Sequence, residues 1–109
     1  MLIHGRMIYH DCIKKDVPKE VLTVSIDDRE INWTYTPKFA KVYSKKREFQ
    51  LRINKQLDKI FTNPERGKYM SHNRKGLLEL YHESCRLYYT YNKIKNLVVI
   101  VEFSHKDYQ

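Results

Sequence analysis

The sequence predicts an α+β domain in which a helical hairpin packs on one face of a mainly antiparallel four-stranded sheet, with an extra segment at the N-terminus. Two observations predict this class. Apolar residues recur at helical spacing from residue 37 to residue 61. After a polar loop at residues 63–76, three strand-like runs follow one another with short links, and a fourth such run precedes the helices.

The N-terminal segment has the weakest pattern. Residues 17–22 could open a short helix with Pro18 in its first turn. Apolar residues between positions 21 and 26 also alternate loosely, which leaves a strand open as the alternative. The polar residues 27–30 are typical of a turn. Residues 31–36 then predict the first strand of the sheet, because their side chains favour extended structure and alternate in character.

A helix start follows at Thr36-Pro37, where the threonine hydroxyl can cap the helix and proline gives up no needed hydrogen bond. The apolar spacing is interrupted at residues 44–47, so the stretch forms either two helices or one kinked helix with a basic cluster at the break. Asn63-Pro64 ends the helical stretch, since proline disfavours helix at the residue before it.

The three C-terminal runs, residues 77–82, 85–91 and 97–103, predict antiparallel strands joined by hairpins. The last run is apolar on both faces, so it should be central in the sheet. Strand alternation places Cys85, Leu87 and Tyr89 on one face of the middle run, and Arg86, Tyr88 and Thr90 on the other.

Size and composition predict one domain spanning residues 1–109, with residues 1–30 as an N-terminal extension and residues 31–109 as the core. No run approaches the ~20 apolar residues that a membrane span needs. The first residues lack the apolar centre of a secretory signal, so we expect a cytoplasmic protein without membrane contact. Cys12 and Cys85 lie far apart, and we expect neither a disulfide nor a metal site from them.

The positive charge is concentrated in the middle of the chain. The net charge is +8, and residues 37–75 hold twelve Lys or Arg against three Asp or Glu. A localised basic surface is typical of proteins that bind phosphates, and such binding weakens as salt rises. The alternative is a lysine-rich helix surface that is only solvated. The localisation favours nucleic-acid binding.

The order of these elements resembles the RelE/ParE superfamily of toxins from toxin–antitoxin pairs, over residues 31–108. The resemblance is carried by four stretches in order and spacing: Ile60-Phe61-Thr62-Asn63-Pro64-Glu65-Arg66-Gly67-Lys68, Gly76-Leu77-Leu78-Glu79-Leu80, Cys85-Arg86-Leu87-Tyr88-Tyr89 and Ser104-His105-Lys106-Asp107.

The resemblance implies one of two activities. RelE-type members are endoribonucleases that cut mRNA, typically in the ribosomal A site, without a metal or other cofactor. ParE-type members poison DNA gyrase and lack the nuclease residues. A third possibility is a non-toxic nucleic-acid-binding module on the same scaffold. The resemblance also implies a cognate antitoxin whose acidic segment covers the basic surface of the toxin.

Arg86 matches the arginine in the middle strand of the RNA-cutting members. Arginine stays protonated and offers a planar fork to phosphate, so it can stabilise charge on the equatorial oxygens. The alternative for Arg86 is a structural ion pair with Glu79 or Glu102.

Histidine is the residue type suited to proton transfer near neutral pH, so His105 could give or take a proton, and Lys106 beside it would be a second cation. Tyr108 could stack on a base or hold the leaving oxygen. The alternative for all three is an exposed C-terminal tail. We expect the Arg86 guanidinium to meet the His105–Lys106 pair over one face of the sheet.

Glu79 and His72 are the candidates for the proton acceptor. In the best-known RNA cutter the matching strand carries two functional lysines, whereas Leu77 and Glu79 stand at those places here. The substrate backbone would be held by basic residues, whose phosphate contacts position RNA without reading sequence. Tyr88 could stack on bases. The predicted RNA-binding residues are Lys45, Lys46, Arg47, Arg52, Arg66, Lys68, Arg74 and Lys75.

Overall fold

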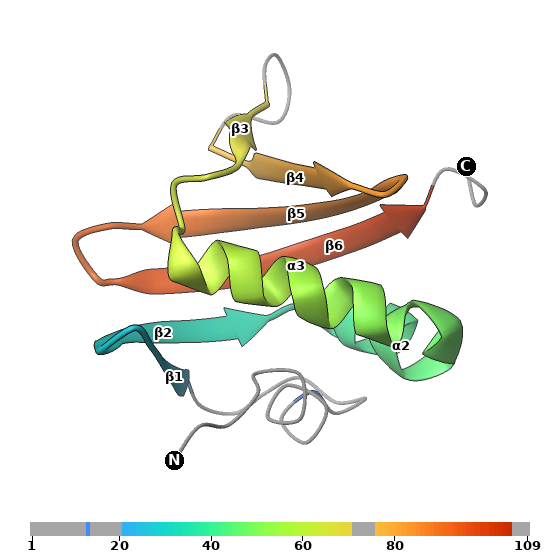
Figure 1. Ribbon diagram of the computed structural model, residues 1–109, viewed down its shortest axis with the longest axis horizontal. Coiled ribbons are helices and arrows are strands. Elements are labelled where there is room, and N and C mark those ends of the chain that lie inside the picture. Colours follow the sequence, from blue (N-terminus) through green and yellow to red (C-terminus); the bar gives the residue numbers. More distant parts are fainter. Residues whose placement is uncertain (1–12, 14–20, 71–75, 106–109) are drawn as a thin grey trace.

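The computed structural model describes residue 13, residues 21–70 and residues 76–105. These residues form a mixed sheet with two helices on one of its faces (Figure 1). The sheet has six strands in the order β1-β2-β6-β5-β4-β3. In chain order the elements are β1 (Leu22–Ile26), β2 (Arg29–Tyr35), α2 (Pro37–Lys45), η1 (Arg47–Phe49), α3 (Gln50–Thr62), β3 (Lys68–Tyr69), β4 (Leu78–His82), β5 (Cys85–Asn92) and β6 (Leu97–His105).

The prediction of four strands was wrong, although the α+β class with helices on one face is confirmed. β1 forms a hairpin with β2, in which Asp27 and Asp28 both have positive φ and make a two-residue turn. Such turns match the twist of the paired strands. The other additional strand, β3, comes from the expected loop and pairs with β4 over two residues. β1 falls where loose alternation at residues 21–26 had left a strand open, so the strand alternative is confirmed there. Residues 17–20, where the alternative helix would begin, lie outside the described residues. β3 has only two residues, too few to show a periodicity.

The predicted central position of the last strand is confirmed. β6 lies between β2 and β5, parallel to the former and antiparallel to the latter. A strand paired on both sides in mid-sheet is sheltered from water, which explains its continuous apolar run. β4 and β5 are joined by a two-residue turn at Glu83 and Ser84, where φ is positive at both positions.

The helical stretch divides where the apolar spacing predicts. α2 begins at Pro37, with Thr36 as its N-cap, and ends at Lys45. Lys46 leaves the helical conformation, with φ −99° and ψ 70°, and the short helix η1 then leads into α3. The break lets both helices turn their apolar side to the sheet.

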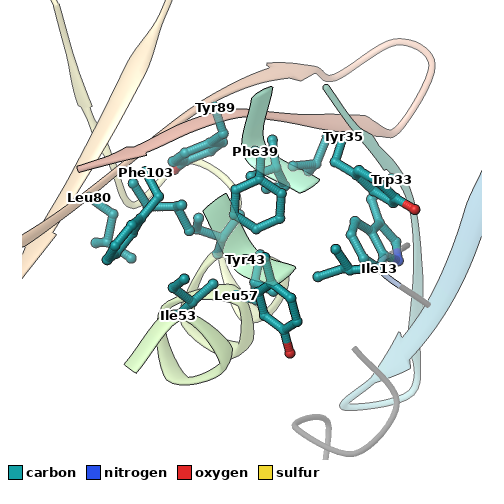
Figure 2. Packing of buried hydrophobic residues seen from close by; sticks show 14 of the residues in the cluster. Ile13, Trp33, Tyr35, Phe39, Tyr43, Ile53, Leu57, Leu80, Tyr89 and Phe103 are labelled. Atoms are coloured by element: carbon teal, nitrogen blue, oxygen red, sulfur yellow. The ribbon is translucent and has the colours of Figure 1, made fainter. Parts of the chain in front are cut away.

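The core lies between the helices and the facing side of the sheet (Figure 2). Trp33 and Tyr89 from the strands and Phe39 and Ile53 from the helices belong to this one core, and all four are almost completely buried. Polar contacts tie the layers together. The Gln56 amide on α3 donates hydrogen bonds to the carbonyl oxygens of Leu80 on β4 and Cys85 on β5, at 3.0 and 3.2 Å.

A β-bulge interrupts the pairing of β5 with β6. Tyr88 is opposite Glu102 and Tyr89 is opposite Ile100, so Val101 is the extra residue. Its carbonyl oxygen accepts a hydrogen bond of 2.6 Å from the Thr36 hydroxyl, the same group that caps α2. The bulge shifts the alternation of β6 by one residue beyond Val101.

Neither α2 nor α3 is long and apolar enough to cross a membrane, and this holds for the described residues only.

Candidate functional site

The sheet face opposite the helices carries a group of polar side chains, which we call the open face. Its members lie on three adjacent strands: Glu79, Tyr81, Arg86, Tyr88, Glu102 and Ser104. Directly opposite residues of antiparallel strands point to the same side of a sheet. The register therefore defines one row of Tyr81, Arg86 and Ser104, and a second row of Glu79, Tyr88 and Glu102.

Arg86 is held at the centre of this face. Its Nε lies 3.0 Å from Oε2 of Glu79, the diagonal neighbour on β4. Its guanidinium carbon lies 5.3 Å from the centroid of the Tyr81 ring. The Arg86 side chain stays 40% exposed. Because the ion pair uses Nε, the terminal nitrogens keep donors that can reach an anion arriving from solvent.

Cations flank the second row at both ends. Lys68 on β3 is opposite Glu79, and Lys38 at the start of α2 makes an ion pair of 3.4 Å with Glu102. Lys38 reaches Glu102 because β2 ends at Tyr35 and α2 begins beside the part of β6 that β2 leaves uncovered. The open face therefore combines two carboxylates with three cations. Such cations can bind an anion, and such carboxylates can accept a proton.

His105 does not join Arg86, so the expected meeting of the two over one face was wrong. His105 is opposite Cys85 on the helix side, is only 7% exposed, and its ring centroid lies 4.7 Å from that of Phe49. The bulge at Val101 is the physical reason, since it moves His105 to the core side while Ser104 takes the place beside Arg86.

The predicted basic residues fall into separate regions. Lys45 and Arg47 are exposed at the break between α2 and α3, with Lys46 half-buried between them. Arg66 is exposed in the loop after α3. Among the described members of the predicted RNA-binding set, Lys68 is the one that the strand register places on the open face.

Arg52 belongs to a second cluster on the helix side. Its guanidinium lies over the Phe49 ring at 5.7 Å and hydrogen-bonds the Cys85 thiol. Burial raises the pKa of that thiol, and the Arg52 hydrogen bond opposes the shift. A buried thiol with a raised pKa is protonated at neutral pH and is a poor nucleophile.

The Tyr89 hydroxyl holds the loop after α3 through two hydrogen bonds. The Tyr89 hydroxyl donates to the Pro64 carbonyl at 2.8 Å and accepts from the Gly67 amide at 2.9 Å. A Cβ on residue 67 would lie 2.6 Å from that hydroxyl, so only glycine permits the approach. The Asn-Pro-Glu-Arg-Gly stretch that carried part of the resemblance therefore has a structural role.

Several predicted residues lie outside the described part of the chain: His72, Arg74, Lys75, Lys106 and Tyr108. Among the residues that the structure describes, no three His, Cys, Asp or Glu side chains gather as metal ligands. Sequence reasoning did not single out Tyr81 or Lys38. The position of Tyr81 opposite Arg86 follows from the tight turn at residues 83–84, and this register could have identified it.

The fold has a known counterpart. The crystal structure of the toxin–antitoxin complex RelBE2 from Mycobacterium tuberculosis contains a chain that matches with a TM-score of 0.60 and 19% sequence identity. The match covers 68% of this chain and 95% of that chain. This chain and that chain of the RelBE2 complex therefore share a fold. No protein-family model matches this chain, and no curated protein matches it either.

Proposed function

We propose that this chain is the toxin of a type II toxin–antitoxin pair and acts in the cytoplasm as a metal-independent endoribonuclease on mRNA, in association with the ribosome. The observation that supports this most is the Arg86–Glu79 pair, which places a fixed cation 3.0 Å from a carboxylate on the open face of a RelE-like fold.

In the proposed reaction Glu79 takes the proton of a ribose 2′-hydroxyl as its oxygen bonds to the adjacent phosphorus. Arg86 donates hydrogen bonds to the equatorial oxygens, where negative charge accumulates. The bond from phosphorus to the 5′-oxygen then breaks, leaving a 2′,3′-cyclic phosphate, and the 5′-oxygen takes a proton. With His105 buried, Lys106 and Tyr108 stay the predicted donors for that last step.

The basic residues on the helices have a different place in the proposal. Lys45, Arg47 and Lys55 project from the helical layer, on the side away from Arg86. Such a surface can hold phosphates of a large RNA or the acidic segment of an antitoxin by charge. We propose that the cognate antitoxin is acidic and covers this surface.

The test is induction of the chain in cells, with mRNA analysed by primer extension. Arg86→Lys keeps the charge but loses the planar fork, and Glu79→Gln keeps the shape but loses the base. We expect either change to lower cleavage about 10²–10³-fold, the loss typical of one transition-state donor. Lys93→Ala, at an exposed hairpin position paired with Glu65, is the matched control and should cut like the wild type. Unchanged cleavage by Arg86→Ala, with the fold intact by circular dichroism, would remove the proposal.

The burial of His105 favours a second candidate, because it removes one group expected to transfer protons. The same fold could poison DNA gyrase, or bind nucleic acid without cutting it. Gyrase poisoning predicts trapped DNA cleavage complexes and an SOS response while mRNA stays whole. A non-toxic binding module predicts normal growth after induction.

A further inference from the structure

We infer that Tyr81 is a base-stacking residue, whose exposed ring receives an unpaired base of a single-stranded nucleic acid while Arg86 binds the neighbouring phosphate. This inference rests on the proposed function in one respect, the use of Arg86 as a phosphate ligand. Beyond the proposed function, it states that the base of the ligand is recognised and that the ligand is single-stranded.

The first support is the exposure of the ring. Tyr81 is 55% exposed although the Arg86 guanidinium already lies over the ring. β3 is opposite Glu79 and Leu78 only, so in the described chain no strand lies beside Tyr81 at this edge of the sheet. A planar ligand can therefore approach the ring from solvent without moving the backbone.

The second support is the position of the ring relative to the phosphate site. Glu79 fixes Nε of Arg86, and Tyr81 lies directly opposite Arg86 on the next strand. A phosphate bound by the terminal nitrogens of Arg86 would lie beside the Tyr81 ring. The base of the same nucleotide is separated from that phosphate by one sugar, so it could reach the ring. Aromatic rings and arginine planes are the surfaces on which single-stranded nucleic acids stack their bases.

The other candidate tyrosines fit this role less well. Tyr88 shares the open face but is only 8% exposed, so its ring cannot receive a base. Tyr69 is 68% exposed, but it is opposite the core residue Leu78 and so belongs to the helix side of the sheet. Tyr81 alone of these three combines exposure with contact to Arg86.

The inference defines a ligand class. Stacking on one ring accepts any base, because every base has a π-face, but it requires a base that is not held in a duplex. The site should therefore prefer single strands over duplexes of the same sequence and should tolerate changes of base.

The experiment measures binding and needs no cleavage. The probe is a short 2′-O-methyl RNA, which lacks the attacking hydroxyl, carrying the fluorescent base 2-aminopurine. A second probe has abasic sites in the same backbone. We expect the wild type to quench 2-aminopurine and to bind the base-containing strand more tightly than the abasic strand. Tyr81→Leu should weaken binding of the base-containing strand about tenfold and leave binding of the abasic strand unchanged.

Two controls make the outcomes distinguishable. Tyr81→Phe keeps the ring and should bind like the wild type, and Tyr69→Leu removes an exposed tyrosine from the other face and should also do so. Equal binding of the base-containing strand by the wild type and Tyr81→Leu would overturn the stacking role alone. Undiminished binding of both strands by Arg86→Ala, or no binding by the wild type, would overturn the phosphate site and this inference with it, whereas the proposed function is decided separately by primer extension in cells.

Discussion

Replacing Thr36 by valine tests the link between the start of α2 and the bulge in β6. The Thr36 hydroxyl accepts the Phe39 amide at 3.2 Å and donates to the Val101 carbonyl at 2.6 Å. Valine keeps the shape of the side chain and removes both bonds. Loss of an N-cap costs about 1 kcal/mol, and a part-buried carbonyl left without its donor costs about 1 kcal/mol more. We therefore expect Thr36→Val to lower the free energy of unfolding by about 2 kcal/mol.

The assay is urea unfolding followed by far-ultraviolet circular dichroism, where this loss should lower the midpoint by about 1 M. Thr36→Ser keeps the hydroxyl and should stay close to the wild type. Thr34→Val is the matched control, because Thr34 is half-buried on β2 and makes no side-chain hydrogen bond within the described residues. If Thr36→Val unfolds within about 0.5 kcal/mol of the wild type, like an ordinary surface change, the two hydrogen bonds of the hydroxyl do not stabilise the fold as argued.

Two further predictions concern β5. Tyr89→Phe leaves the Pro64 carbonyl and the Gly67 amide without their partner, so we expect a loss of about 2 kcal/mol in the same urea assay, while Tyr91→Phe should cost little. Because burial raises the pKa of the Cys85 thiol above its ordinary value of 9.0, the unfolded chain releases this proton first as the pH rises. The contribution of Cys85 to the free energy of unfolding should thus be fully present below pH 9 and be lost as the pH increases through the raised pKa. The free energy of unfolding of Cys85→Ala should therefore decline less steeply at alkaline pH. An identical slope in that variant would contradict the assignment.

Elements with a local cause were predictable from the chain. The start of α2 depends on the capping hydroxyl of Thr36 and the proline ring of residue 37. The break near Lys46 was indicated by a change in the spacing of apolar residues. The alternation that places Cys85 and Arg86 on opposite sides of β5 is a property of any strand. Such features need only neighbouring residues, so the sequence predicts them well.

The site was predictable only in part. The sequence indicated Arg86 and left two carboxylates, Glu79 and Glu102, as its possible partners. The structure selects Glu79, because the β4–β5 register makes it a diagonal neighbour, while Lys38 from α2 engages Glu102. Both contacts depend on which strands and helices come together, which no local pattern contains.

The helices, the hairpin strands and the importance of Arg86 could be predicted from the chain, because spacing and capping depend on consecutive residues. The burial of His105 and the position of Tyr81 beside Arg86 become visible only in the folded protein. A single extra residue in β6 reverses the side on which His105 emerges, and the carbonyl oxygen of that residue accepts a hydrogen bond from a hydroxyl sixty-five positions away in the chain. The candidate site is consequently a property of strand register, which forms only when distant segments pair.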